Sequence, residues 1–130
     1  MDILLDTATF LWWIAGNRKL SAATAAVLRD PAHRVWLSAA STWEITIKNS
    51  TGKLPLPDDP TIFVPAQRAR HDIDFLPIGE MECLQVGKLP PLHRDPFDRM
   101  LVAQSIVHGL QIATSDPLVR QYPCRWIWLT

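Results

Sequence analysis

Four acidic residues that lie far apart in the sequence occupy equivalent places in the predicted fold. Each stands where a predicted strand meets the next helix, or in the first turn of that helix: Asp6, Glu44, Asp98 and Asp116. The carboxyl ends of parallel strands share one edge of a sheet, so side chains at these junctions should meet in one cleft. The sequence therefore predicts a cluster of four carboxylates.

Such a cluster favours a hard divalent cation, because like charges held close together raise one another's pKa and a cation removes the conflict. Mg²⁺ and Mn²⁺ take carboxylate and phosphate oxygens as ligands. No His-x-x-x-His or Cys-x-x-Cys spacing supports a zinc site. The chemistry expected is hydrolysis of a phosphodiester, in which the cation activates water and a carboxylate takes the proton.

Helix capping is an alternative explanation for some of these acids. Residues 41–44, Ser-Thr-Trp-Glu, fit a capping box in which Glu44 reaches back to the Ser41 amide. Asp6 and Asp116 each precede a helical stretch, so both also fit the N-cap position. The sequence leaves the two explanations open for each residue.

The segment LHRDPFDRMLVAQS, residues 92–105, carries a further aspartate. Asp95 is the expected N-cap of a helix that begins with Pro96. Asp98 follows in the first turn, where the helix dipole favours an acid. We interpret Asp95 as the cap that holds the helix start, and Asp98 as the residue that points toward the strand ends.

Nearby basic residues have two possible roles. Arg94 and Arg99 could pair with Asp95 on the surface, or Arg99 or Lys48 could contact a substrate phosphate. The histidines share no spacing, and we expect them to be solvated or capping: His33, His71, His93 and His108.

Short apolar runs alternate with stretches of helical length along the whole chain. Strands are predicted at residues 3–5, 34–40, 73–78, 110–115 and 125–129. Helices are predicted at residues 7–16, 22–29, 41–52, 61–71, 79–86, 96–109 and 117–122, with Pro65 expected to kink or delay the fourth. This alternation predicts an α/β fold, a three-layer α/β/α sandwich around a mostly parallel sheet.

The composition suits one domain spanning residues 1–130. The 13 basic and 13 acidic residues cancel, so contact with a polyanion must be local or bridged by metal. The apolar start carries Asp2 and Asp6, has no preceding Lys or Arg, and is too short to span a bilayer. We therefore expect a cytoplasmic protein with no membrane partner.

Tryptophan is frequent in this chain, with six residues that mostly fall in predicted core elements. Burial in the core is the default expectation for them. Trp12 and Trp13 are adjacent and cannot share one face of a helix. One of the two is therefore a candidate for a protein interface.

Four segments together resemble the PIN-domain family, in particular the VapC-type toxins of bacterial toxin–antitoxin pairs. They are ILLDTATFLWWIAG, LSAASTWEITIKNSTGKL, HRDPFDRMLVAQS and LQIATSD. The resemblance implies an endoribonuclease dependent on Mg²⁺ or Mn²⁺, usually a homodimer. The family's catalytic and metal-binding acids correspond to Asp6, Glu44, Asp98 and Asp116. Asp95 also lies in the motif, and we assign it as a helix cap that could support the metal ligands. Three hydroxyls could orient ligands or water: Thr7, Ser38 and Thr114.

The resemblance also implies a small antitoxin whose C-terminal segment lies in a groove of the toxin. An apolar groove bearing tryptophan near the N-terminal helix would suit it. Zero net charge favours either selective recognition of one structured RNA or a basic channel built by the dimer. A phosphatase of the haloacid-dehalogenase type would need an acid at position 8, which is alanine. Another metal-dependent phosphohydrolase, or a catalytically silent interaction module, stays an alternative.

Overall fold

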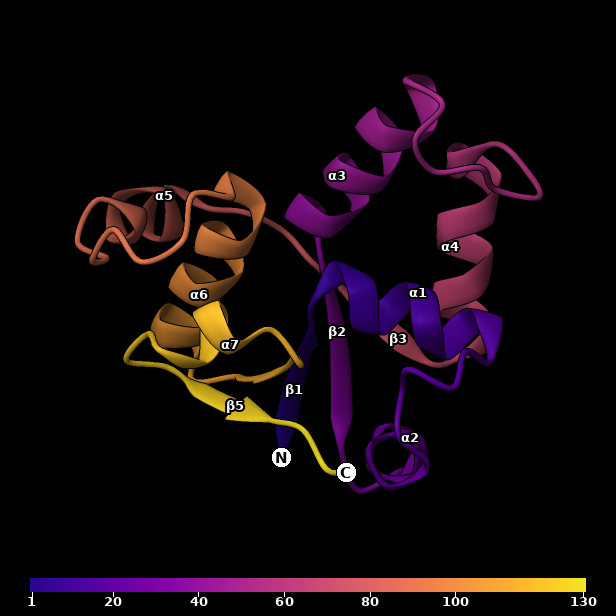
Figure 1. Cartoon of the computed structure of the whole chain (residues 1–130), viewed down its shortest axis with the longest axis horizontal. Coiled ribbons are helices and arrows are strands. Elements are labelled where there is room, and N and C mark those ends of the chain that lie inside the picture. The colour runs from indigo at the N-terminus through magenta and orange to yellow at the C-terminus, as the bar shows by residue number, and fades with distance from the viewer.

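The computed structural model describes residues 1–130 and contains one five-stranded sheet with helices on both faces (Figure 1). The strands are β1 (Asp2–Leu5), β2 (Arg34–Ser38), β3 (Ile73–Leu76), β4 (Gln111–Ala113) and β5 (Arg125–Ile127). The helices are α1 (Thr7–Ala15), α2 (Ala22–Arg29), α3 (Ala39–Ser50), α4 (Pro60–Arg70), α5 (Glu80–Val86), α6 (Pro96–His108) and α7 (Pro117–Arg120). All neighbouring strands are parallel, in the order β3-β2-β1-β4-β5, which confirms the predicted parallel sheet.

Two apolar cores form because successive side chains of a strand point to opposite faces of the sheet. Ile3 and Leu5 pack with residues of α1, α2, α3 and α4 on one face. Leu4 points the other way and packs with residues of α6 and α7. Helix α5 lies against α6 on that second side (Figure 1). The predicted three-layer sandwich is therefore confirmed.

Three aspartates begin helices as the sequence predicts. Their Oδ1 atoms accept backbone N–H groups in the pairs Asp6–Thr9 (2.8 Å), Asp95–Phe97 (2.9 Å) and Asp116–Leu118 (2.9 Å). Pro96 takes the first position of α6, where its missing N–H costs no helical bond. These caps fix the backbone on which the acidic side chains stand.

The capping box expected at residues 41–44 was wrong. Strand β2 ends at Ser38, and the Ser38 hydroxyl accepts the Ala40 N–H at 2.9 Å, so α3 begins before Ser41. Glu44 consequently lies in the second turn, too far along to reach back to the helix start. Pro65 does not delay α4, which begins at Pro60 and continues through it.

The expected burial of the tryptophans was wrong for two of the six. Trp43 is 61% exposed and Trp126 is 42% exposed, whereas Trp13 belongs to the buried core and Trp12, Trp36 and Trp128 pack against the cores, partly buried. Trp12 is partly buried and meets Trp128 edge to face. None of the helices has both the length and the apolar character needed to cross a membrane.

Candidate metal centre

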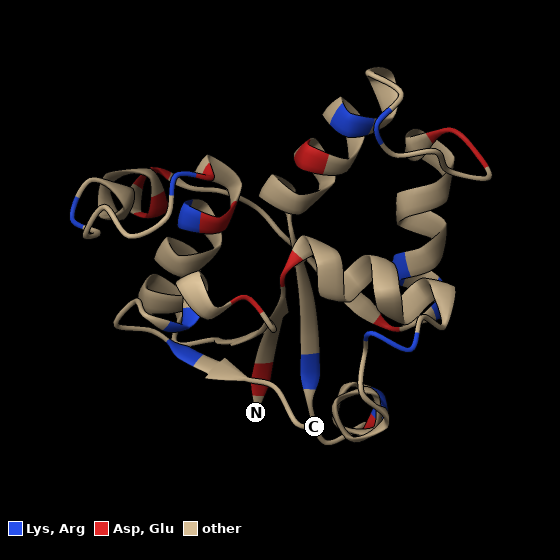
Figure 2. Ribbon diagram, viewed as in Figure 1, with Lys and Arg blue, Asp and Glu red and all other residues tan.

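A cleft lies at the point where the strand order reverses. From central β1 the chain moves to β2 and β3 on one side, and then returns to β4 and β5 on the other. Parallel α/β sheets bind ligands at such a switch point, outside the carboxyl ends of the strands. The cleft has a volume of about 510 Å³, and its charged lining comprises Asp6, Glu44, Asp95, Asp98, Asp116, Lys48 and Lys53. Figure 2 shows acidic residues at the neighbouring ends of β1, α3 and α6.

Asp6 is buried directly after β1, in the floor of this cleft. Burial raises the pKa of its carboxyl, hydrogen bonds from Thr114 and Thr9 oppose the shift, and the charge of Asp116 adds to it. The sequence explained Asp6 either as a helix cap or as a site residue. The structure shows that one carboxylate both caps α1 and lines the cleft.

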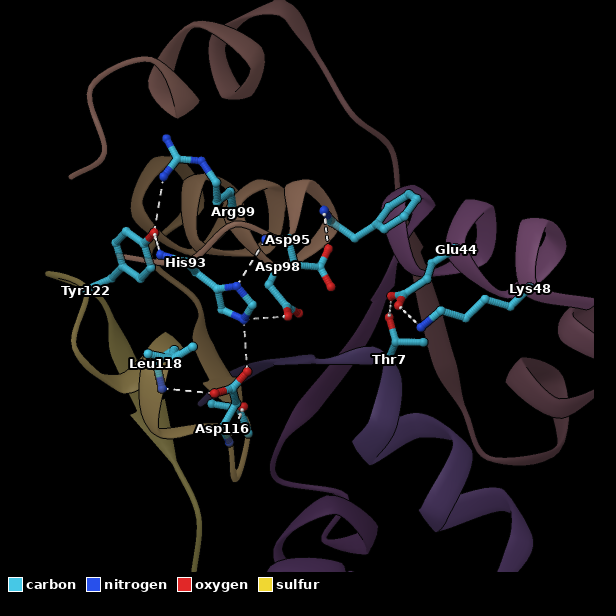
Figure 3. A network of polar contacts seen from close by, with 12 residues as sticks. Thr7, Glu44, Lys48, His93, Asp95, Asp98, Arg99, Asp116, Leu118 and Tyr122 are labelled. Carbon is cyan, nitrogen blue, oxygen red and sulfur yellow. Dashed lines mark hydrogen bonds and ion pairs between the residues drawn. The ribbon is translucent and has the colours of Figure 1, made fainter. Parts of the chain in front are cut away.

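Asp98 and Asp116 come from different elements and meet at a histidine (Figure 3). The Nε2 atom of His93 lies 3.1 Å from Oδ2 of Asp98 and 3.0 Å from Oδ2 of Asp116. His93 Nε2 and one oxygen of each carboxylate all lie within 4.8 Å of one another, a spacing that suits groups around a single metal ion. The structure thus brings Asp98 and Asp116 together at one histidine.

The second ring nitrogen of His93 indicates where its proton lies. Nδ1 accepts the backbone N–H of Asp95 at 3.1 Å, so this nitrogen carries no hydrogen. A neutral imidazole then has its proton on Nε2, which faces the two carboxylates as a donor. His93 Nε2 therefore donates to Asp116 and lies against the Asp98 carboxylate, and in this tautomer the ligand atoms for a cation come from the acids.

Glu44 faces the cleft from α3 with partners of its own (Figure 3). The Thr7 hydroxyl donates to Oε1 at 2.6 Å, and Lys48 Nζ donates to Oε2 at 2.6 Å. The bond to Glu44 is the largest cause of a raised pKa for Lys48. Glu44 is thus held at the far side of the cleft from the Asp98–Asp116 pair, with its charge largely balanced by Lys48.

The electrostatics of the cleft fit a divalent cation. Burial, followed by the charges of Asp95 and Asp6, raises the pKa of Asp98 to about 7, while His93 opposes the shift and Glu44 adds to it. Carboxylates crowded in this way gain from a positive ion among them. The oxygen donors are those that hard cations prefer. The residues present therefore fit the predicted class of metal ion.

The three hydroxyls singled out in the sequence have different surroundings. Thr7 supports Glu44, and Thr114 accepts the Asp116 N–H at 3.0 Å and contributes to the hydrogen bonding of Asp6. Ser38 is buried and uses its hydroxyl to cap α3. Thr7 and Thr114 thus lie beside acids, whereas Ser38 sets the start of the helix that carries Glu44.

Arg99 points away from the cleft, so it does not have the place of a substrate-binding residue, a role that the sequence left open. Its guanidinium donates to the Val86 and Pro90 carbonyls and to the Tyr122 hydroxyl, each at 3.1 Å. The Arg99 backbone N–H donates to the Asp95 carbonyl at 3.1 Å, but no ion pair joins their side chains. Successive residues of a helix point in different directions, and Asp98 takes the cleft side of α6.

The sequence-based interpretation missed His93, which it treated as a solvated or capping residue. No spacing shared with the other histidines marks it. The available signal is its place two residues before the N-cap Asp95, where the turn into α6 brings the ring over Asp98. The contact with Asp116 depends on the packing of α7 and could not be read from the sequence.

These features define an α/β protein with a candidate metal centre at the switch point of its sheet. The chain belongs to the PIN domain family, whose model matches residues 3–123. A segment of 47 residues is 43% identical to Ribonuclease VapC16 of Mycobacterium tuberculosis (strain ATCC 25618 / H37Rv). That segment covers 36% of this chain and 33% of the relative, so the match spans about a third of that protein.

Solved structures of low sequence identity share the fold. VapBC2 from Rickettsia felis, bound to a DNA fragment from the promoter, matches with a TM-score of 0.68 and 12% identity over 99% of this chain and 100% of that chain. VapBC-1 from nontypeable Haemophilus influenzae matches with a TM-score of 0.63 and 19% identity over 98% and 97%. The predicted resemblance to the PIN family is therefore confirmed.

Proposed function

We propose that this protein is a VapC-type endoribonuclease toxin that uses Mg²⁺ or Mn²⁺ to hydrolyse RNA phosphodiester bonds. The observation that carries the proposal is the convergence of four acids from separate elements on one cleft: Asp6, Glu44, Asp98 and Asp116. Membership of the PIN family and the similarity to a named ribonuclease over part of the chain support the same activity.

The residues of the cleft would have different roles in the hydrolysis. When bound, the cation supplies positive charge that stabilises the reacting phosphoryl group and lowers the pKa of water. Asp98 and Asp116 would hold it, with Asp6 beside them in the floor. Asp6, with its raised pKa, is also suited to accept a proton from the attacking water.

The positive charge that binds the substrate would come from lysines within the cleft, because the chain as a whole has no excess of basic over acidic residues. Lys48 lies beside Glu44 (Figure 3), and Lys53, whose backbone N–H donates to the Lys48 carbonyl, also lines the cleft. A backbone phosphate next to the scissile one could lie between these lysines. Local charge of this kind suits a selected RNA better than indiscriminate binding.

An antitoxin partner is the second part of the proposal. The two structural neighbours named above are VapBC assemblies. An apolar groove of about 560 Å³ runs between α1, α4 and residues 54–57, and Leu11, Trp12 and Leu54 line both this groove and the acidic cleft. A peptide lying in the groove could therefore extend a basic side chain to the carboxylates.

We also propose a homodimer, which the family resemblance implies, and a cytoplasmic location, which the N-terminal sequence led us to expect. Light scattering of the isolated protein would give its mass in solution. A mass equal to one chain at micromolar concentration would contradict the homodimer. Fractionation of the native cells would test the location.

Cleavage of an RNA pool by the purified protein, with and without Mg²⁺ or Mn²⁺, tests the enzymatic proposal. We expect cation-dependent cleavage that Asp6→Asn and Asp98→Asn each abolish. Asp58→Asn is the matched control, because Asp58 is an exposed acid in the loop before α4, outside the cleft. Equal activity of wild type and both cleft variants, or no cleavage with either cation, would refute the nuclease assignment.

A further inference from the structure

Tyr122 connects three segments of the chain behind the acidic cleft. It is buried just after α7 (Figure 3). Its hydroxyl oxygen accepts the His93 backbone N–H at 2.8 Å and Arg99 Nη1 at 3.1 Å. One oxygen thus joins the loop before α6, helix α6 itself and the C-terminal segment.

The Arg99 guanidinium reinforces this junction from the other side. Its remaining bonds to the Val86 and Pro90 carbonyls fasten the loop between α5 and α6 to the helix. The loop contains Pro90 and Pro91 and has no helix or strand before α6 begins. Tyr122 and Arg99 therefore hold the backbone from which the His93 ring projects.

The orientation of the His93 ring follows from this anchoring. Its backbone N–H is held by Tyr122, and its Nδ1 atom is held by the Asp95 N–H. With both contacts in place, Nε2 faces the two carboxylates, with a hydrogen bond to Asp116 and a distance of 3.1 Å to Asp98. Groups that hydrogen-bond the carboxylate ligands of a metal fix their orientation, and losing one weakens metal binding roughly 10–100-fold.

We propose that Tyr122 is a positioning residue for the metal centre, acting through His93 to hold Asp98 and Asp116 at the spacing that a divalent cation requires. This rests on the proposed function in one respect, namely that those two acids hold the cation. In this proposal neither Tyr122 nor His93 would be a ligand of the cation or contact the substrate. Tyr122 therefore acts on cation affinity, ahead of any step of RNA cleavage.

Titration of Mn²⁺ into the full-length protein, followed by isothermal calorimetry, tests the proposal without RNA. Tyr122→Phe keeps the buried ring and removes the junction oxygen, so we expect the Kd for Mn²⁺ to rise about tenfold. Thr24→Val is the matched control. Thr24 is buried and fastens the same C-terminal segment through Leu129, without contact to His93, so we expect a change below about twofold.

A second pair of variants keeps the test decisive if Tyr122→Phe fails to fold. His93→Gln retains an N–H donor near the position of Nε2, whereas His93→Ala has none. We expect His93→Gln to bind Mn²⁺ within about threefold of wild type and His93→Ala to lose about tenfold or more. Nitrogen NMR of His93 in the Mg²⁺-loaded protein should show the proton still on Nε2.

Unchanged Mn²⁺ affinity in a folded Tyr122→Phe protein would overturn the proposal. Equal affinities of His93→Gln and His93→Ala, or a Mg²⁺-loaded His93 with its proton on Nδ1, would do so too. Failure of the wild type to bind Mn²⁺ would refute the metal centre itself, and with it both the positioning role and the proposed function. A failure of the positioning role alone can therefore be distinguished from a failure of the proposed function.

Discussion

Lys48 Nζ lies 2.6 Å from Oε2 of Glu44, so the one acid of the cleft that is supplied by α3 already has a cationic partner. Replacing Lys48 by methionine would keep the aliphatic stem and remove the charge. We expect Lys48→Met to bind Mn²⁺ about 2–5-fold more tightly, because the cleft becomes more negative, and to show a raised KM for RNA. Calorimetry and steady-state kinetics would measure the two effects.

Lys88→Met is the control for that change, since Lys88 is exposed in the loop after α5 and does not line the cleft. It should leave both quantities near the wild-type values. If Lys48→Met weakened Mn²⁺ binding, Lys48 would be organising Glu44 for the cation and not competing with it.

The raised pKa of Asp98 predicts that the metal-free protein loses stability as the pH increases. The pKa is 3.8 in its ordinary state and about 7 in the folded protein, so the folded state holds the proton more tightly. The stabilising contribution is complete below the ordinary value and is lost as the pH rises through about 7. In the chelated protein at pH 8, Asp98→Asn should therefore be more stable than wild type by on the order of 1–2 kcal/mol.

Thermal unfolding in the presence of a chelator at a series of pH values would measure this. The advantage of Asp98→Asn should shrink as the pH falls below about 7 and disappear only as it falls below the ordinary pKa of 3.8, where the side chain is protonated in both the folded and the unfolded state. Asp58→Asn should follow the wild-type curve at every pH. An advantage for Asp98→Asn that did not depend on pH would show that ionisation of Asp98 is not its cause.

Proton competition at Asp98 also predicts how cation binding depends on pH. Below pH about 7 a cation must displace the proton from this carboxyl, so the Kd for Mn²⁺ should increase about tenfold for each unit of decreasing pH. Above that value the affinity should level off. Calorimetry in buffers of different ionisation enthalpy would also count the protons released. A Kd that is constant from pH 6 to 8 would contradict this prediction.

Asp95 and Asp98 should respond differently to the same substitution. Asp95→Asn preserves an N-cap oxygen for the Phe97 N–H, so we expect a fold of near wild-type stability with most of the RNA cleavage retained. Asp98→Asn should reduce cleavage by about 100-fold or more, because it removes a cation ligand. Comparable losses in both variants would place Asp95 among the essential acids. Cleavage rates at saturating Mn²⁺, together with melting temperatures, would decide the matter.

The position of the acids could be predicted because it depends on topology alone. Once strands and helices alternate, the carboxyl ends of the strands share one edge of the sheet, so Asp6 and Asp116 are expected at that edge. That β1 and β4 are direct neighbours comes from the structure. The start of α6 could be predicted equally well, because Asp95 and Pro96 form a local N-cap signal. In these cases the information lies within a few residues or in a general rule of sheet connection.

Other features depend on partners that no local pattern identifies. Glu44 is oriented by Thr7 from α1, which lies 37 residues away in the chain. Arg99 turns from the cleft because Val86 and Tyr122 offer it acceptors. Helix α3 begins earlier than predicted because Ser38, and not Ser41, is its N-cap. Such choices are made by tertiary packing, and they give each of the four acids in the cleft its own set of partners.

The caps on α1 and α7 make two backbone amides into internal probes of the cleft. The Thr9 and Leu118 N–H groups donate directly to Asp6 and Asp116, so any redistribution of charge on those carboxylates alters the electron density at the amides. Their chemical shifts in a ¹⁵N-labelled sample should respond to Mg²⁺ before any substrate is added. Occupancy of each side of the cleft could then be followed separately in the unmodified protein.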